Sequence, residues 1–531
     1  MTDPICPFDM IDLHRTLDHL SFSLSAWGPE LVLCAGIVVL LLSRMVFPLG
    51  RYLPFVISLI VCCLALFLAG PWNGTWPIVG ENSVPIFSGL LAWDGLGAFL
   101  KTLILGFSAL FVVFLWLSGF PKPAHATDFL VLYLGAVVGM CVMVSAEHLL
   151  LAFLGMEMAS VPSYVLAGFD RRARQSAEAA MKFAVFGAAS AGVMLYGISL
   201  LGGVLGTFSI PQMADQLMLL AASGDYHGQA VILVLSSLMI LVGLAFKLSA
   251  VPFHFWLPDV FEGAAAEVGT FLSVVSKAAA LGLLTRLVLG LLGYGVLEAT
   301  NAGVLPIVTF LVVTLSLLSA ATCTYGNLAA YGQNNIKRLL GYSTIAHAGY
   351  MLMPIAAAVA VLFRDASLAR WAIATLLFYL VTYLFMNFAA FATVTFLRNA
   401  FRSETIADFA GLIRTSPGVV VCMSLALFSL VGLPPLAGFA GKFAIFSSLV
   451  FGGLWSLFVI AAINTVLSLF YYVRIIKTMV FDVPVRDPLP QVRLASPKGI
   501  FLAVLTVPVI VLGILWQPVF MLACRAAGYP W

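Results

Sequence analysis

The sequence predicts an all-α protein that crosses a membrane many times. Hydrophobic residues make up 62% of the 531 residues, charged residues make up only 9%, and the mean hydropathy is +1.09. Soluble domains carry about 25% charged residues, so this composition is typical of an integral membrane protein. The apolar runs follow one another with short connections, which predicts a single membrane domain over 1–531. The net charge of +3, with no basic tract interleaved with aromatic residues, argues against nucleic-acid binding.

Fourteen apolar runs are long enough to cross a hydrocarbon core of ~30 Å, because a helix rises ~1.5 Å per residue. We group them as N-terminal helices 1 to 3 (27–118), a first repeat (127–294), a second repeat (303–480) and a C-terminal helix (498–524). The predicted spans are 27–47, 54–71, 89–118, 127–145, 147–167, 178–205, 229–262, 266–294, 303–326, 336–362, 370–398, 418–450, 453–480 and 498–524.

The seventh and twelfth runs, 229–262 and 418–450, are too long to be straight transmembrane helices. Each would measure about 50 Å as one helix, against a hydrocarbon core of ~30 Å. The seventh contains Pro252 and the twelfth contains Pro434 and Pro435. A proline removes a backbone donor and clashes with the preceding turn, which leaves carbonyls free inside the membrane. We therefore predict that helices 7 and 12 are broken and that protein or water surrounds the breaks.

The two broken helices also indicate an internal repeat. Lys247 and Lys442 lie in matching places within them, five spans apart. An odd number of spans in each copy turns the second copy upside down relative to the first. The sequence therefore predicts two inverted five-helix repeats, formed by spans 4 to 8 and spans 9 to 13.

Basic residues predict the orientation in the membrane. Each connection is numbered by the span that it follows. The even-numbered connections contain essentially only two basic residues, Arg364 and Arg370, whereas most Lys and Arg residues lie in the odd-numbered ones. By the positive-inside rule the odd-numbered connections face the cytoplasm, so both termini lie on the periplasmic side. Lys337 and Arg338 are interpreted as topology anchors at a cytoplasmic helix end. The basic residues of the odd-numbered connections are Arg44, Arg51, Lys122, Arg171, Arg172, Arg174, Lys337, Arg338, Arg398, Arg402, Arg414, Arg474, Lys477, Arg486, Arg493 and Lys498.

Four charged residues inside apolar runs indicate an ion path, because an isolated charge in hydrocarbon costs at least ~2.5 kcal/mol. Glu157 lies in the middle of span 5, and Lys247 on broken span 7 is its best candidate partner. Moving these two charges relative to each other would load or release a proton. Lys277, in span 8, is the candidate next station and Lys442 the terminal one. The alternative interpretation is a purely structural ion pair.

Three further residues are weaker candidates for the proton path. Lys182 lies near a membrane face, where its side chain could instead extend to the interface. His254 follows the break in span 7, and His347 lies in the middle of span 10. A lone membrane histidine is as often a hydrogen-bonded core residue as a proton relay, so both interpretations stay open for these two.

Several segments resemble one known family, subunit N of bacterial NADH-quinone oxidoreductase. This subunit is the counterpart of mitochondrial subunit 2 of respiratory complex I and a relative of cation/proton antiporters. The resemblance covers roughly residues 90–480, and its motifs occur in the same order. The segments are Glu157 to Phe169, Glu178 to Phe183, Lys247 to Gly263, Phe271 to Ala280, Asn335 to Ser343, and Gly432 to Lys442.

The resemblance implies an antiporter-like subunit that pumps protons with redox energy released elsewhere in the complex. It implies a bacterial inner-membrane location and, as partners, the lipid bilayer, antiporter-like sibling subunits and small membrane subunits. The family's buried acid on helix 5 falls on Glu157. Its lysines on broken helix 7, on helix 8 and on broken helix 12 fall on Lys247, Lys277 and Lys442.

One segment departs from the family pattern. After Glu262-Gly263 the family usually runs Ala-Pro-Thr-Pro-Val, whereas this chain has Ala264 to Val268, with Glu267 where the second proline is expected. Proline suits the first turn of a helix, and an acid there interacts favourably with the helix dipole. We therefore expect span 8 to form, with altered proton access near Lys277.

The motifs argue against a cofactor in this chain. It has no Gly-x-Gly-x-x-Gly loop after a strand, no cysteines with iron–sulfur spacing and no paired membrane histidines for haem. We expect it to be a non-redox, metal-free subunit, with NADH, flavin, iron–sulfur clusters and quinone bound by other subunits. Two alternatives remain: a stand-alone cation/proton antiporter, and a structural subunit that does not pump.

Overall fold

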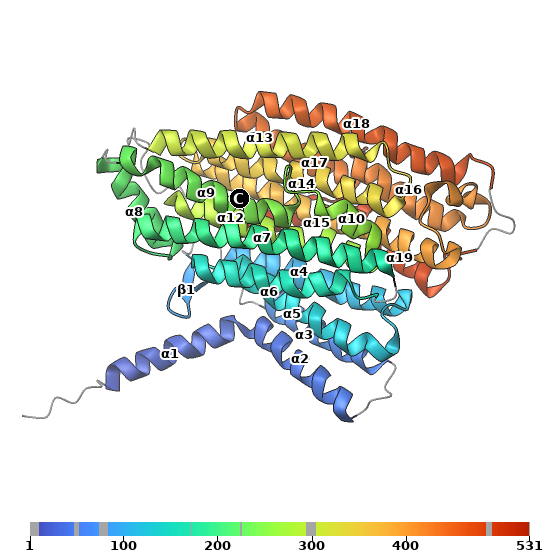
Figure 1. The fold of residues 1–531 in the computed structure, drawn as a ribbon, viewed down its shortest axis with the longest axis horizontal. Helices are drawn as coiled ribbons and strands as arrows, with labels where there is room; N and C mark the ends of the chain where they lie inside the picture. Colours follow the sequence, from blue (N-terminus) through green and yellow to red (C-terminus); the bar gives the residue numbers. More distant parts are fainter. Residues whose placement is uncertain are drawn as a thin grey trace, which may run out of the picture.

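The structure is a computed structural model that describes residues 10–46, 52–73, 83–170, 173–223, 226–293, 304–484 and 491–529. Most of the long helices lie roughly side by side along the horizontal axis of Figure 1. Helices α1 (Met10–Ala26) and α2 (Gly28–Val46) meet in a V below the main body. Four of the basic connection residues, Arg51, Arg171, Arg172 and Arg486, lie outside the described residues.

Among the described residues, twelve helical segments are long and apolar enough to cross a membrane. Lipid offers no hydrogen-bond partners to the backbone of these apolar segments. Only a helix or a closed barrel pairs every backbone group internally, and these segments form helices. The helices are α2, α4 (Gly95–Ser118), α5 (Ala126–Ser145), α6 (Leu149–Ala167), α7 (Arg174–Leu205), α9 (Tyr226–Leu248), α11 with α12 (Ala266–Ser273, Val275–Leu291), α13 (Val304–Ala330), α14 (Ile336–Val361), α15 (Ala366–Phe401), α18 (Trp455–Val480) and α19 (Pro497–Ile514).

Three shorter apolar helices complete the set of crossings: α3 (Leu53–Ala69), α16 (Pro417–Val431) and α17 (Ala437–Phe451). Because α16 and α17 follow each other across one interruption, together they form one broken crossing. Adding this crossing and α3 to the twelve gives fourteen. The prediction of a polytopic all-α membrane protein with about 14 transmembrane helices is confirmed.

Some elements that do not cross the membrane were not predicted. A two-stranded antiparallel hairpin precedes α4, and a helix connects α7 to α9. These elements are too short or too amphipathic to stand out in a search for long apolar runs. They are β1 (Val84–Ile86), β2 (Leu91–Trp93), α8 (Ile210–Ser223), α20 (Gln517–Ala526) and the single-turn 3₁₀ helices Pro71–Asn73, Pro123–His125, Ile406–Phe409 and Leu412–Arg414.

The hairpin and α20 correct two predicted boundaries. Span 3 begins at Gly95 and not at 89, because Asp94 caps α4 by accepting a hydrogen bond from the Gly97 amide at 2.8 Å. The last predicted span, 498–524, divides into α19, which ends at Ile514, and the short α20.

The centre of the protein is formed by span 8 (α11 and α12), α14 and α15. Of their most apolar windows, 94%, 94% and 89% of the residues are buried, against only 22% for α13 and 33% for α18. In Figure 1, α13 and α18 run along the upper edge of the molecule. The central helices therefore carry the residues that are shielded from lipid, and charges on them face protein.

Both predicted interruptions are present. Helix α9 ends at Leu248 and α10 (Trp256–Gly263) continues span 7, while α16 ends at Val431 and α17 begins at Ala437. Protein groups satisfy the exposed backbone at the first break: the Trp256 indole donates to the Phe246 carbonyl at 3.1 Å. The prediction that helices 7 and 12 are broken is confirmed. A further break, at Val274 between α11 and α12, was not predicted.

Close packing at glycines supports the repeat. In the first repeat α5 and α6 approach so closely that a Cβ on Gly139 would lie 2.6 Å from the Ala159 nitrogen. In the second repeat α13 and α14 do the same, and a Cβ on Gly326 would lie 2.5 Å from the Ala346 nitrogen. Small residues permit such close helix contacts in membranes. The equivalent helix pairs of the two repeats are therefore packed in the same way.

Candidate functional site

Lys247 is buried in the last turn of α9, directly before the break in span 7. Its ammonium donates a hydrogen bond to the Ser160 hydroxyl of α6 at 2.9 Å. Glu157 lies on the same helix, one turn before Ser160, and is half-buried. In the described part of the chain Glu157 forms no ion pair within 4.0 Å. Lys247, the predicted partner of Glu157, therefore interacts with it electrostatically but not through a direct ion pair.

Lys277 is buried in the first turn of α12, and it connects two other helices. Its ammonium donates to the Leu248 carbonyl at 2.7 Å and to the Thr344 carbonyl at 3.2 Å. Leu248 is the last residue of α9, so Lys277 caps the carbonyl end of the broken helix. A cation at a helix C-terminus is favourable because carbonyl dipoles converge there. This contact joins spans 7 and 8 to α14.

His347 lies in the middle of α14 and is held between two tyrosines. Its Nδ1 atom is 2.7 Å from the Tyr379 hydroxyl of α15, and its Nε2 atom is 3.3 Å from the Tyr472 hydroxyl of α18. The Tyr472 hydroxyl is also hydrogen-bonded to the Ser343 hydroxyl. Both ring nitrogens therefore contact groups that can donate or accept a proton.

Lys442 is buried in α17, on the far side of the second break. Its ammonium donates to the Val431 carbonyl at 2.9 Å and lies 4.5 Å from the centre of the Tyr350 ring. Val431 is the last residue of α16, so Lys442 also caps the carbonyl end of a broken helix. A cation over an aromatic face is attracted by the ring quadrupole.

The sequence placed Lys247 and Lys442 at matching positions, and the structure corrects this. Lys247 precedes its break, whereas Lys442 follows its own. In contacts the counterpart of Lys442 is Lys277, because each donates to the final carbonyl of a half-helix. The sequence already contains this difference, because Lys247 precedes Pro252 whereas Lys442 follows Pro434 and Pro435.

One side of α14 connects the two capping lysines. Thr344, His347 and Tyr350 follow at intervals of three residues and therefore lie on neighbouring turns of that side. Thr344 contacts Lys277 through its carbonyl, and Tyr350 lies under Lys442. We call the five residues Lys277, Thr344, His347, Tyr350 and Lys442 the central file. All five are buried, in a region where a charged group needs partners.

His254 lies outside the central file. Its ring is buried between the rings of Phe255 and Tyr325, each with its centre 4.3 Å away. Phe255 and Tyr325 are themselves exposed, which places His254 at the periphery of the chain. The structure therefore brings His347 to the lysines but not His254.

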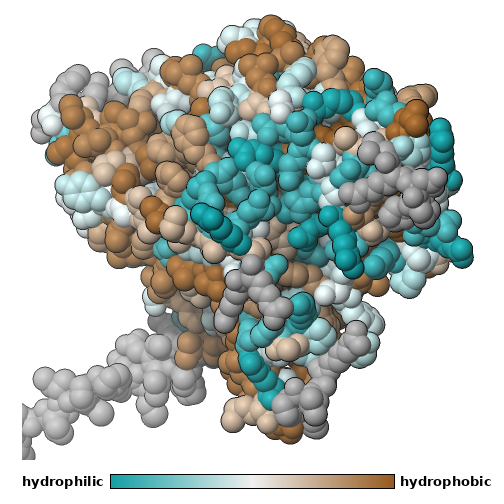
Figure 2. All heavy atoms as spheres, turned by 45° about the vertical axis from the view of Figure 1, so that its right-hand side comes forward, coloured by the Kyte–Doolittle hydropathy of each residue, from teal (hydrophilic) through white to brown (hydrophobic). Residues whose placement is uncertain are grey.

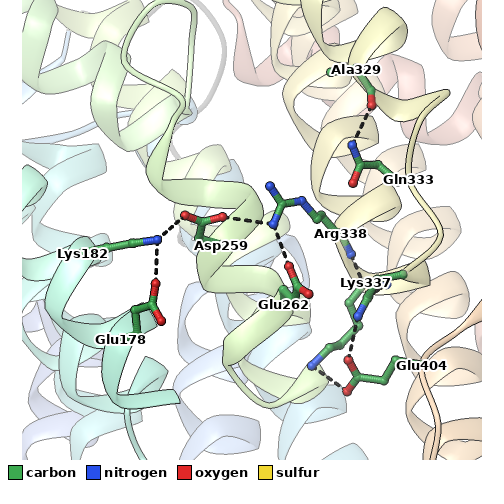
Figure 3. Close-up of polar contacts among 10 residues, drawn as sticks. Glu178, Lys182, Asp259, Glu262, Ala329, Gln333, Lys337, Arg338 and Glu404 are labelled. Carbon is green, nitrogen blue, oxygen red and sulfur yellow. Dashed lines mark hydrogen bonds and ion pairs between the residues drawn. The ribbon is translucent and has the colours of Figure 1, made fainter. Parts of the chain in front are cut away.

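Lys182 belongs to a network of charges at one end of the helices. Its ammonium contacts Glu178 at 2.8 Å and Asp259 at 2.7 Å, and Arg338 joins Asp259 to Glu262 at 3.1 and 2.6 Å. Figure 3 shows this chain of alternating charges across α7, α10 and α14. Figure 2, which brings the right-hand end of Figure 1 forward, shows hydrophilic residues gathered on that face between hydrophobic ones.

Lys337 is more than a topology anchor. It is only 2% exposed, and its ammonium contacts Glu404 at 2.7 Å and the Ala264 carbonyl at 2.9 Å. Arg398 contacts the same Glu404 carboxylate at 2.8 Å. Arg338, in contrast, is a third exposed, as an anchor at a helix end would be.

Two buried charge clusters were missed by the sequence analysis. Lys101 of α4 pairs with Glu30 of α2 at 2.7 Å. Arg286 of α12 binds Asp94 at 2.8 Å and lies 3.8 Å from Glu147. A scan for every charge inside an apolar run would have found Lys101, Glu30 and Arg286. In the described residues no group of three or more metal-ligating side chains converges.

Comparison with known proteins identifies the relatives of this fold. Residues 146–468 match the protein-family model described as "NADH:quinone oxidoreductase/Mrp antiporter, TM". NADH-quinone oxidoreductase subunit N of Anaeromyxobacter sp. (strain Fw109-5) is 36% identical, over 92% of this chain and 94% of the relative. Subunit N 2 of Sorangium cellulosum (strain So ce56) is also 36% identical, over 97% and 99%.

Solved structures show the same fold. A chain of respiratory complex I from Thermus thermophilus, solved with bound aureothin, superposes with a TM-score of 0.72 at 29% identity, over 94% of this chain and 100% of that one. A chain of the Mrp complex from Dietzia sp. DQ12-45-1b superposes with a TM-score of 0.76 at 18% identity, over 96% and 97%. At that lower identity the likeness shows the fold alone.

The broken helices and the buried lysines thus define a polytopic, antiporter-like membrane protein. More narrowly, with relatives at 36% identity over almost their whole length, the chain belongs to the family of NADH-quinone oxidoreductase subunit N.

Proposed function

We propose that this chain is a proton-translocating membrane subunit of a bacterial NADH-quinone oxidoreductase, coupled to quinone reduction elsewhere in the complex. The observation that carries the proposal is the central file, in which His347 lies on the same side of α14 as Thr344 and Tyr350, the residues that contact the two buried lysines. Lys247 with Glu157 and Ser160 extends the path at one end. Lys182 lies in the charged network at one end of the helices, and His254 has a smaller role because its ring packs against Phe255 and Tyr325, outside the central file.

The chemistry of the central file suits proton transfer. A buried lysine changes protonation readily, because desolvation opposes its charge while carbonyl acceptors stabilise it. Lys277 and Lys442 each have such an acceptor at the end of a half-helix. His347 and its tyrosine partners supply groups that both donate and accept protons. A small movement of either half-helix would alter the acceptors of the adjacent lysine and so its affinity for a proton.

The energy must come from partner subunits. Moving one charge against 100 mV costs about 2.3 kcal/mol. We propose that the chain carries no cofactor of its own and receives this energy by conformational or electrostatic coupling. Its partners would be antiporter-like sibling subunits and small membrane subunits, in the bacterial inner membrane. Both termini would lie on the periplasmic side.

A second function is a stand-alone antiporter that exchanges sodium for protons. The family model that matches residues 146–468 is the observation that favours it, because its description names Mrp antiporters beside NADH:quinone oxidoreductase. We expect the chain, purified from native membranes, to come with other complex I subunits. In vesicles the purified complex should pump protons when NADH and quinone are added. Sodium–proton exchange by the chain alone, without redox partners, would contradict the proposal.

Replacing Gly432 with alanine should displace Lys442 and slow pumping. Gly432 has φ = +93°, and an added Cβ would lie 3.0 Å from Lys442 Cδ. A side chain in this left-handed region costs about 1–2 kcal/mol. Gly453→Ala is the matched control, because Gly453 also has positive φ but nothing lies within 4 Å of its added Cβ. NADH-driven pumping should fall only in the Gly432 variant. Equal rates in both variants would show that Gly432 does not help to position Lys442.

A further inference from the structure

Glu267 is a buried acid that no step described so far uses. It is 1% exposed, in the first turn of α11, and its Oε2 atom has no hydrogen-bond partner in the described part of the chain. A buried carboxylate oxygen without a partner is costly, so its presence calls for an explanation. The resemblance to the subunit N family predicts proline at this position, so the acid is a departure from that pattern.

Charged and polar groups from several helices surround this carboxyl group. The charges of Lys337 from α14 and Arg398 from α15 act on it, as does the Ser118 hydroxyl at the end of α4. Lys337 also donates to the Ala264 carbonyl, three residues before Glu267. Glu404 already pairs with both cations, at 2.7 and 2.8 Å. Glu267 is therefore not required as the first partner of either cation.

The remaining charges nearby are paired with one another. On α10, which also packs against α11, Glu262 contacts Arg338 at 2.6 Å, and Asp259 contacts Arg338 and Lys182. These groups are about a third exposed and form the surface network of Figure 3. Glu267 thus lies one layer deeper than this network, at the same end of the helices.

A stripe of polar side chains leads from Glu267 to Lys277. Thr270 and Ser273 follow it on successive turns of α11, and both are fully buried. Asn387 of α15 donates to the Ser273 hydroxyl at 2.7 Å, and its Oδ1 atom has no hydrogen-bond partner among the described residues. Ten residues of regular helix rise about 15 Å, which is half of a ~30 Å hydrocarbon core, and here the break at Val274 interrupts the helix before Lys277. The stripe therefore occupies the part of span 8 between the basic end of the helices and the central file.

We propose that Glu267 collects protons at the basic end of the helices and passes them along Thr270 and Ser273 to Lys277. The carboxylate takes up a proton from water and becomes a neutral acid. It releases this proton to the hydroxyl stripe, each hydroxyl passes one proton on as it receives one, and neutral Lys277 becomes an ammonium. This inference rests on the proposed proton-pumping function, since it supplies the entry to the same central file.

The test is Glu267→Gln in the intact complex, with proton pumping measured across a range of pH. We expect pumping to fall severalfold at alkaline pH, where protons are scarce and a collecting group matters most, and to approach wild type at acidic pH. Glu267→Asp should keep the wild-type profile. A purely structural acid in the first turn, interacting with the helix dipole, would instead change stability and leave the pH profile unaltered.

Thr270→Val provides a second, independent variant if Glu267→Gln does not assemble. Its matched control is Thr506→Val in α19, because both buried hydroxyls donate to the carbonyl four residues earlier, at 2.9 and 2.8 Å. A shifted pH profile in Thr270→Val alone would support the path. A wild-type profile in Glu267→Gln, or in Thr270→Val when only that variant assembles, would overturn it. Lys247→Ala serves as the reference: if that variant pumps normally, the proposed function itself fails, independently of Glu267.

Discussion

Replacing Lys247 with alanine in the assembled complex is expected to lower quinone reduction and proton pumping together, by about a hundredfold, the lower range for a lost proton-transfer group. Lys247 is the cation that meets α6 at Ser160, directly before the break in span 7. An alanine leaves neither a charge nor a proton carrier between Glu157 and the central file. Both activities should be measured in vesicles, with subunit content checked to confirm assembly.

Lys477→Ala is the control for the loss of a lysine, because Lys477 is exposed at the end of α18. It should leave both activities unchanged. Lys247→Arg would keep the charge but not the readily exchanged proton, so we expect it to assemble better than alanine without restoring pumping. Wild-type pumping in Lys247→Ala would assign Lys247 a structural role and favour a subunit that does not pump.

The membrane crossings were predictable because the bilayer fixes their length and hydropathy. The two long runs with prolines were predictable for the same reason, since no straight helix of that length fits the hydrocarbon core. The hairpin before α4 and the connecting helix α8 were not, because short or amphipathic segments resemble ordinary loops in hydropathy. The break at Val274 was not predictable either, because neither a proline nor a glycine lies at that position.

The lysines of the site were predictable, but their partners were not. A charge inside an apolar run is visible in the sequence, as Lys277 and Lys442 were. The carbonyls of Leu248 and Val431 carry no side-chain signal, and become acceptors only because the helices end there. The sequence indicated Lys247 as the charge partner of Glu157 but not the geometry: their charges interact without a direct ion pair, and Ser160, one turn further along α6, accepts the hydrogen bond of Lys247.

Arg286 was overlooked because the argument from basic residues considered the connections between spans and the charges near the breaks. It lies in the second half of α12, in an apolar run, and is 1% exposed. Its two terminal nitrogens bind the two oxygens of Asp94, each at 2.8 Å. Asp94 in turn caps α4, so this cluster ties span 8 to the start of span 3.

Arg286→Met is therefore expected to destabilise the subunit by about 3–5 kcal/mol, the usual cost of breaking a buried ion pair from one side. The change leaves the carboxylates of Asp94 and Glu147 facing each other without a cation. Thermal unfolding of the purified complex and the amount assembled in membranes should both decrease. Arg525→Met, the same exchange at an exposed position of α20, should change stability by no more than about 0.5 kcal/mol.

The pH dependence of this variant follows from Glu147, which lies between α5 and α6. Burial raises the pKa of the Glu147 carboxyl, and Arg286 opposes that rise. Without Arg286 the folded-state pKa rises further, so folding favours the protonated acid. A carboxyl group with a raised folded-state pKa makes its full contribution to stability at a pH below its unfolded-state pKa. This contribution is lost as the pH rises through the folded-state pKa. The deficit of Arg286→Met should therefore shrink toward acidic pH, and adding Glu147→Gln should remove the part of that pH dependence that Glu147 contributes. A deficit that is constant with pH would show that Glu147 is not the group left unpaired.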